Sequence, residues 1–289
     1  MHDQLAKSIL SPHNGMNLYR GCSHGCIYCD SRSLCYNMQH SFEDIEVKIN
    51  APSLLEDALK RKRNKCMIGT GSMCDPYLHL EREVELTKTC FQLIERYGFG
   101  LSIITKSDLI LRDLDLLKRI NEKTKCVVQM TLTTYDEALC KVIEPNVCTT
   151  KRRVEVLHTL KENNIPTVVW LSPILPFIND TEENLRGLLG YCIDVGVYGI
   201  ICFGFGVTLR DGDREYFYNK LDEHFPGLKD KYIKKFGNAY EVRSEQHEAL
   251  THIFRKVCQE NGILCDKTKI FDYLHTFEDK SALDQLSLF

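Results

Sequence analysis

From about residue 66 the sequence alternates short apolar runs with longer amphipathic stretches, and this alternation restricts the fold more than any other feature. Continuous apolar runs are typical of strands in a parallel sheet that is buried on both faces. Strands are predicted near residues 16–21, 66–70, 101–105, 126–132, 167–171 and 198–203, and helices near 52–63, 81–97, 112–121, 152–163 and 181–195. Six such repeats predict an α/β fold, a partial (βα)6 TIM-type barrel.

The alternation ends near residue 205. Residues 206–212 have the composition of a loop, and the apolar spacing in 213–224, 228–235 and 244–259 predicts helices. We therefore expect three parts: a barrel over 1–205, a C-terminal helical extension over 206–275 and a flexible tail over 276–289.

Composition narrows the possible functions. No apolar run approaches the roughly 18 residues that a membrane span needs, and the chain does not start with a secretory signal. We expect a cytoplasmic protein with no membrane association and with reduced thiols. The formal net charge of −3 gives no global attraction for nucleic acid, so any such contact must be local. The 14 cysteines then suggest metal or redox chemistry.

Three cysteines after the first predicted strand carry the strongest chemical signal. Cys22, Cys26 and Cys29 have the spacing CxxxCxxC, so one loop can wrap a single metal centre. Gly21 and Gly25 let the backbone curl around that centre and offer amide groups to its sulfurs.

The choice of metal depends on the number of ligands. Structural zinc needs four ligands and would require His24, Cys35 or His40, with spacings unlike the common zinc-finger patterns. A four-iron four-sulfur cluster held by three thiolates leaves one iron free to bind a substrate. The triad therefore favours iron–sulfur over zinc.

These residues resemble the signature of the radical S-adenosylmethionine (radical SAM) superfamily, with Tyr28 just before the third cysteine. Further segments resemble its spore photoproduct lyase-like branch over residues 13–205: 17–22, 69–77, 104–107, 144–145, 172–176 and 179–180. The resemblance implies a partial barrel of the radical SAM kind that holds a four-iron four-sulfur cluster and S-adenosyl-L-methionine (SAM). Reductive cleavage of SAM would produce a 5′-deoxyadenosyl radical, and an electron donor such as flavodoxin or ferredoxin would be needed.

The same resemblance assigns roles to single positions. It implies that Cys22, Cys26 and Cys29 bind the cluster and that Tyr28 lies against the adenine of SAM. The remaining cofactor-binding positions implied are Gly69, Thr70, Gly71 and Ser72 for the amino group, and Lys106 and Thr131 for the carboxylate and ribose. Strand ends are where a parallel barrel presents its active site.

The match departs from the lyase at two positions. Asp30 stands where the lyase has a tyrosine after the third cysteine, and Ser72 occupies the slot of the thiol that returns a hydrogen atom to the product radical. Cys74, two residues further, is a shifted candidate for this catalytic hydrogen donor. Radical transfer requires near contact, so thymine-dimer cleavage does not follow directly from the match.

The last five residues form a second short motif. Gln285, Leu286, Leu288 and Phe289 resemble the motif by which replication and repair proteins bind the bacterial β sliding clamp. The alternative is a helix end that packs Leu283, Leu286 and Phe289 on the barrel.

The leading hypothesis is a radical SAM enzyme that acts on damaged or modified DNA and is recruited by the clamp. The alternatives are radical modification of RNA, a peptide or a small molecule, and a non-enzymatic iron–sulfur or zinc redox module.

Overall fold

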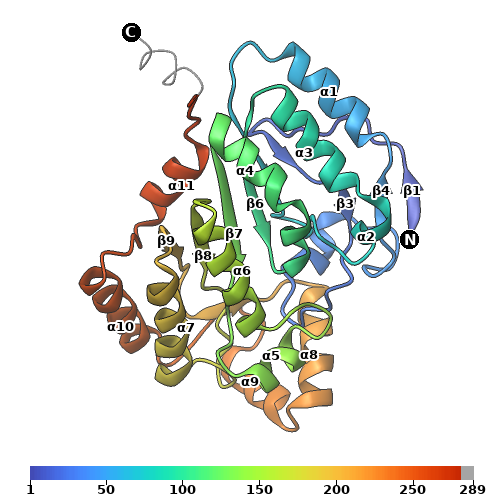
Figure 1. Ribbon diagram of the computed structural model, residues 1–289. Coiled ribbons are helices and arrows are strands. Elements are labelled where there is room, and N and C mark those ends of the chain that lie inside the picture. The colour runs from blue at the N-terminus through green and yellow to red at the C-terminus, as the bar shows by residue number, and fades with distance from the viewer. Residues whose placement is uncertain (281–289) are drawn as a thin grey trace.

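A computed structural model describes residues 1–280 of the chain. Its main sheet has six parallel strands in the order β2-β5-β6-β7-β8-β9, which confirms the predicted partial barrel (Figure 1). The strands are β2 (Gly15–Met16), β5 (Met67–Thr70), β6 (Gly100–Thr105), β7 (Cys126–Thr131), β8 (Thr167–Trp170) and β9 (Gly199–Ile201). All six residues of β7 are buried, as expected for a central strand that is covered on both faces.

Helices lie around this sheet, and most of them contribute to its hydrophobic core. They are α1 (Ala51–Arg61), α2 (Glu81–Val84), α3 (Leu86–Arg96), α4 (Leu114–Lys123), α5 (Glu137–Ile143), α6 (Thr150–Glu162) and α7 (Glu182–Val195). The predicted helix over 81–97 is interrupted at Glu85, whose φ is +48°. The buried Glu81 carboxylate accepts hydrogen bonds from the Tyr19 hydroxyl and from the Thr87 amide, which fixes the chain on both sides of this break.

The predicted first strand is divided between two sheets. Residues 15–16 belong to the barrel, whereas β3 (Tyr19–Arg20) pairs with β4 (Glu46–Lys48), which also pairs with β1 (His2–Gln4). The change of partner occurs at Leu18, whose carbonyl accepts a hydrogen bond from the Lys48 amide. Alternation along one strand could not reveal this exchange, because β4 lies some 30 residues away in a segment with no strand signal.

The C-terminal segment is mostly helical, with α8 (Asp213–His224), α9 (Leu228–Phe236), α10 (His247–Glu260) and α11 (Lys267–His275). The predicted loop over 206–212 instead begins with β10 (Gly206–Thr208), which pairs antiparallel with β11 (Glu241–Arg243). Ile270 and Leu274 of α11 share a core cluster with Ile201 on the edge strand β9. This helix therefore covers the open edge of the barrel, where unpaired backbone groups would invite association.

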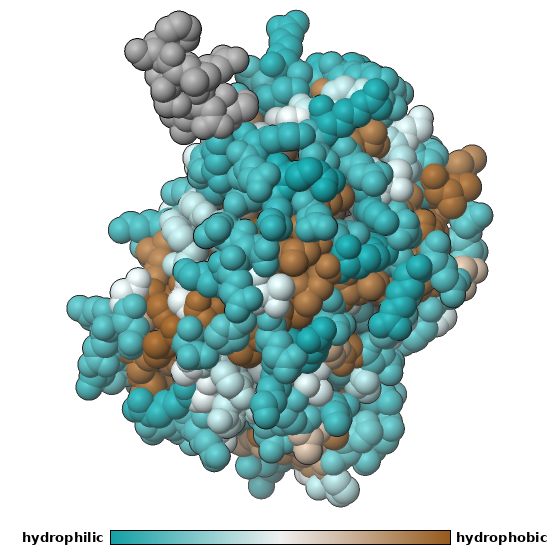
Figure 2. Space-filling model, viewed as in Figure 1, coloured by the Kyte–Doolittle hydropathy of each residue, from teal (hydrophilic) through white to brown (hydrophobic). Residues whose placement is uncertain are grey.

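Residues 276–280 also contact the barrel. Lys125, which is 1% exposed, forms an ion pair of 2.7 Å with Glu278, and the Lys280 amide donates to the Lys123 carbonyl. The face drawn in Figure 2 is mostly hydrophilic, with hydrophobic residues in separate patches. Within residues 1–280, none of the helices combines the length and the apolar character needed to cross a bilayer.

Candidate functional site

The cysteine loop lies directly after β3. Cys22 and Cys26 are buried, and Cys29 lines a cavity of about 660 Å³ at the carboxyl ends of the strands. Gly21 and Gly25 have φ values of +85° and +71°, a conformation that glycine adopts without strain. A Cβ at Gly21 would also lie 2.5 Å from a backbone carbonyl oxygen. The loop is therefore tightly curled around the three thiols, as the sequence predicted.

The residues around the three thiols affect how readily each thiol ionises, and therefore how readily it binds a metal ion. The His24 amide donates to Cys22 Sγ at 3.4 Å, and a hydrogen bond from the Cys74 thiol is the main cause that lowers the pKa of Cys22 to about 6. Burial raises the pKa of Cys26 and of Cys29, which favours the neutral thiols until a cation is bound.

The three side chains considered as a fourth zinc ligand each have other partners. His24 Nδ1 lies 3.6 Å from Asp75 Oδ2, Cys35 Sγ accepts a hydrogen bond from Arg210, and His40 lies beside Glu46. The donor set of the loop is thus three thiolates, which fits an iron–sulfur cluster with one open iron better than a four-ligand zinc ion.

A loop after β5 forms the next part of the site. Gly71 has φ +96°, and a Cβ there would lie 1.9 Å from the Ile104 carbonyl oxygen, so β5 and β6 approach too closely at this point for any side chain. Asp75 fixes the loop by accepting hydrogen bonds from the Thr105 hydroxyl and the Lys106 amide, at 2.7 and 2.8 Å. Gly71 and Ser72 line the cavity, whereas Gly69 and Thr70 lie within β5.

A buried charged network supports the floor of the cavity. The Tyr28 hydroxyl donates to Glu144, which forms an ion pair of 2.6 Å with the fully buried Arg153. Arg153 Nη1 also donates to the Thr131 carbonyl, and Lys106 Nζ lies 5.8 Å from the centre of the Tyr28 ring. Tyr28, Lys106 and Thr131 all line the cavity, so the network joins three predicted SAM-binding positions.

The charges in this network stabilise one another. Burial opposes ionisation of Glu144, but Arg153 and Lys106 outweigh it and lower the pKa of that carboxyl. Burial also opposes the Lys106 ammonium, but Cys26 and Glu144 raise its pKa above the usual value. Lys106 is therefore held as a cation beside the cysteine loop, where it can bind a carboxylate.

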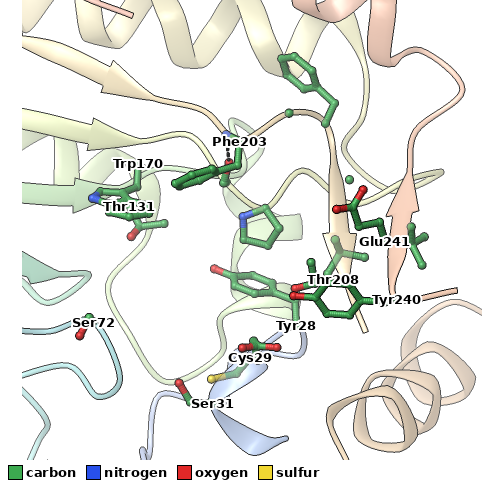
Figure 3. A pocket seen from close by; sticks show the side chains of 18 of the residues that line it. Tyr28, Cys29, Ser31, Ser72, Thr131, Trp170, Phe203, Thr208, Tyr240 and Glu241 are labelled. Atoms are coloured by element: carbon green, nitrogen blue, oxygen red, sulfur yellow. Dashed lines mark hydrogen bonds between the residues drawn. The ribbon is translucent and has the colours of Figure 1, made fainter. Parts of the chain in front are cut away.

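The opposite wall of the cavity comes from the C-terminal half of the chain. Figure 3 shows Thr131 and Trp170 on the barrel side of the cavity. Across the opening lie Thr208 of β10, Tyr240 just before β11, and Glu241 of β11. The sequence did not indicate these two strands, because each has only three residues.

Cys74 does not line this cavity. Its thiol donates to the Gly21 carbonyl at 2.8 Å, on the buried side of the cysteine loop. Its role as a hydrogen donor stays a prediction. Asp30, at the position of the lyase tyrosine, does line the cavity and is held by the Tyr36 hydroxyl and by Arg210.

The sequence analysis missed Asp75 and Arg153 as parts of the site. Asp75 lies in segment 69–77, which resembles the lyase-like branch, but the resemblance assigned it no role. Arg153 lies in a basic run, Lys-Arg-Arg, that is typical of a solvated helix face. The signal available for Arg153 was its helical spacing with Val156, Leu157 and Leu160, all of which face the core.

Comparison with known proteins defines the class. The family model of the radical SAM superfamily matches residues 16–189, so the chain belongs to that superfamily and is an enzyme of the radical SAM type. An uncharacterized protein of Methanocaldococcus jannaschii is 36% identical over 169 residues, or 58% of this chain and 62% of that protein. An uncharacterized Mycobacterium tuberculosis protein is 30% identical over 225 residues, or 75% of this chain and 65% of that protein. The chain thus spans less than two thirds of either relative.

Comparison with solved structures defines the fold more specifically than the family model does. Spore photoproduct lyase complexed with dinucleoside spore photoproduct superimposes with a TM-score of 0.63 over 90% of this chain and 78% of that one, at 16% identity. A double mutant of the lyase with bound AdoMet and dinucleoside spore photoproduct gives a TM-score of 0.56, covering 86% of this chain and 73% of that one, at 15% identity. The fold is therefore lyase-like.

Membership of the superfamily establishes the cofactors as a four-iron four-sulfur cluster and SAM. When bound, these groups would supply a 5′-deoxyadenosyl radical. Cys22, Cys26 and Cys29 would hold the cluster, and the cavity beside Cys29 has room for a ligand of drug-like size. The chain's own residues would exclude water and orient the ligand, with Lys106 as a half-buried cation and Tyr28 as a ring whose hydroxyl is bonded to Glu144.

Proposed function

We propose that this enzyme acts on a damaged or modified base in DNA, in a reaction of the spore photoproduct lyase-like kind. The pair of aromatic rings at the ends of β8 and β9 is the observation that carries the proposal. Trp170 and Phe203 line the cavity with their ring centroids 5.7 Å apart, and Phe203 is 57% exposed. Such exposed rings can stack on a nucleobase, an interaction worth about 1–3 kcal/mol per base.

Basic side chains near these rings support the same substrate class. Lys267 Nζ lies 4.8 Å from the centre of the Phe203 ring, and Arg243, a solvent-exposed residue of β11, lines the cavity. Cations at the edge of an aromatic site can bind the phosphates of a nucleic acid whose base is inserted between or against the rings. The chain has a net charge of −3, so an attraction for DNA would have to come from local cations of this kind.

A duplex base would have to leave the helical stack to reach this cavity. Extrusion of a base costs a few kcal/mol, and the cost is smallest where the base is damaged or unpaired. The proposed enzyme would therefore act on lesions and on single strands more readily than on intact duplex DNA.

The proposal includes two partners. The motif formed by Gln285, Leu286, Leu288 and Phe289 lies outside the described residues, and we propose that it binds the bacterial sliding clamp. A low-potential electron donor such as flavodoxin or ferredoxin would reduce the cluster.

The substrate test combines product analysis with a matched pair of variants. Cluster-loaded enzyme, dithionite and SAM would be incubated anaerobically with UV-damaged DNA, and nucleosides and 5′-deoxyadenosine would be measured by mass spectrometry. Phe203→Ala should raise the KM for damaged DNA about 5- to 150-fold, which corresponds to 1–3 kcal/mol of lost stacking. Ile233→Ala, on α9 and 46% exposed, is the control and should match wild type.

A DNA-independent yield of 5′-deoxyadenosine, with no altered nucleoside, would reject the DNA substrate. RNA, peptide or small-molecule modification would then be tested in the same assay. The clamp requires a separate test, in which deletion of residues 285–289 removes clamp binding but leaves SAM cleavage unchanged. A peptide of these residues that fails to bind the clamp in fluorescence anisotropy would reject that partner.

A further inference from the structure

A second group of metal-binding side chains lies in the small three-stranded sheet, outside the cavity described above. His2, His40 and Asp44 each offer one ligand atom, and these atoms all lie within 4.8 Å of one another. The pairing of β1 with β4 brings them together, since His2 is opposite Glu46 in the parallel register. Figure 1 shows β1 beside β4 at the N-terminal end of the chain.

His40 has the bonding pattern of a metal ligand. Its Nδ1 lies 3.0 Å from the Ser41 carbonyl oxygen, which can only accept, so Nδ1 is the donor and Nε2 is the nitrogen left to face an ion. Nε2 is buried without a hydrogen-bond partner, 3.5 Å from Glu46 Oε2. Metal-binding imidazoles are commonly oriented in this way, by donation of the other ring nitrogen to a carbonyl oxygen.

The other two side chains approach the same point. The rings of His2 and His40 are 4.7 Å apart and perpendicular, and His2 Nδ1 lies 3.0 Å from Asp44 Oδ2. Ligand atoms of a tetrahedral zinc ion lie roughly 3.3 Å apart, given zinc–nitrogen distances of about 2.0–2.1 Å.

We propose that His2, His40 and Asp44 bind a divalent ion of the zinc type. Two imidazole nitrogens and a carboxylate oxygen suit zinc, and binding involves no change of oxidation state. The proposal does not depend on the substrate of the radical reaction.

This ion would stabilise the segment behind the cysteine loop. The Cys22 amide donates to the Phe42 carbonyl at 3.0 Å, and Gly21 is packed so closely on the same carbonyl that a Cβ would not fit. Phe42 lies between the proposed ligands His40 and Asp44. A bound ion would therefore connect β1 to the segment that supports the first cysteine, and would hold this support in place.

The test uses cluster-loaded protein, so that the three cysteines are already occupied. The protein would be incubated anaerobically with a small excess of zinc chloride and desalted, and zinc and iron would be measured by mass spectrometry. Wild type should retain about one zinc per chain more than His40→Gln or Asp44→Asn. The control His252→Ala, which changes an exposed histidine on α10, should match wild type. Absorbance near 400 nm would verify that each variant keeps its cluster.

X-ray absorption at the zinc edge distinguishes this site from the remaining thiols. Nitrogen and oxygen scatterers at about 2.0–2.1 Å support the proposal, whereas sulfur at about 2.3 Å would assign the zinc to cysteines and overturn it. Equal zinc content in wild type and His40→Gln, both with intact clusters, would overturn it as well.

Discussion

Replacement of Arg153 by methionine tests the buried network that supports the cavity floor. Arg153 and Glu144 are both fully buried, so the variant leaves a carboxylate without its main partner. Loss of one member of a buried ion pair costs about 3–5 kcal/mol. The unfolding entropy of 289 residues is about 0.6 kcal/mol/K, at roughly 2.1 cal/mol/K per residue, so the melting temperature should fall by about 5–8 °C.

The assay is thermal unfolding of cluster-loaded protein, followed anaerobically by circular dichroism at a fixed scan rate. Arg152→Met is a matched control, because Arg152 is the neighbour on α6 and forms exposed ion pairs with Asp108 and Glu155. Exposed pairs contribute about 0–1 kcal/mol, so this control should shift the melting temperature by less than about 2 °C. Equal shifts for the two variants would refute the reasoning.

The double variant Glu144→Gln/Arg153→Met removes both charges. It should be less destabilised than Arg153→Met alone, because the Glu144 carboxylate no longer stays buried without its main partner. A loss equal to the sum of the two single variants would contradict this.

The pH dependence gives an independent measurement. Because the pKa of Glu144 is lowered in the folded protein, its contribution is complete above its unfolded pKa of about 4.3 and is lost as the pH falls through the folded value. The difference in stability between wild type and Arg153→Met should therefore be largest near neutral pH and shrink below about pH 4.3.

Three further predictions concern the cysteines and the loop after β5. We expect a loss of about four irons and of the absorbance near 400 nm in Cys22→Ser, Cys26→Ser and Cys29→Ser. The control Cys35→Ser, at an exposed cysteine, should retain both. Stoichiometric zinc without iron uptake would contradict this. Gly71→Ala should abolish SAM binding in equilibrium dialysis, because its Cβ would overlap the Ile104 carbonyl, while Gly190→Ala, with open space, should bind normally. Equal SAM binding by these two variants would show that the β5 loop can shift without cost. Cys74→Ala should leave SAM cleavage intact and change the distribution of products; an unchanged distribution would make Cys74 a packing residue.

The sequence was sufficient for most of the barrel because the strands from β5 to β9 are short, mostly apolar runs. It also placed the cysteine loop, since Gly21 and Gly25 mark where the backbone must adopt positive φ. The second wall of the cavity could not be predicted in this way. β10 and β11 have three residues each and are separated by two helices, so their pairing depends on tertiary contacts and leaves no local pattern.

The division of the predicted first strand between two sheets also depends on tertiary contacts. Tyr19 and Arg20 follow Met16 closely along the chain, but their hydrogen-bonding partner is β4 rather than β5. Periodicity reports which face of a strand is buried, but it does not report which neighbour the strand pairs with.

The contacts of residues 276–280 determine at which end of the barrel residue 280 lies. Lys280 is bonded to Lys123, just before β7 begins, whereas Thr131 at the other end of β7 lines the cavity. Five strand steps of about 3.3 Å separate these ends by roughly 17 Å. A fluorophore, an affinity tag or a tethered protein attached after residue 280 would thus start at the opposite end of the barrel, and the cavity would stay open for substrate during single-molecule or pull-down measurements.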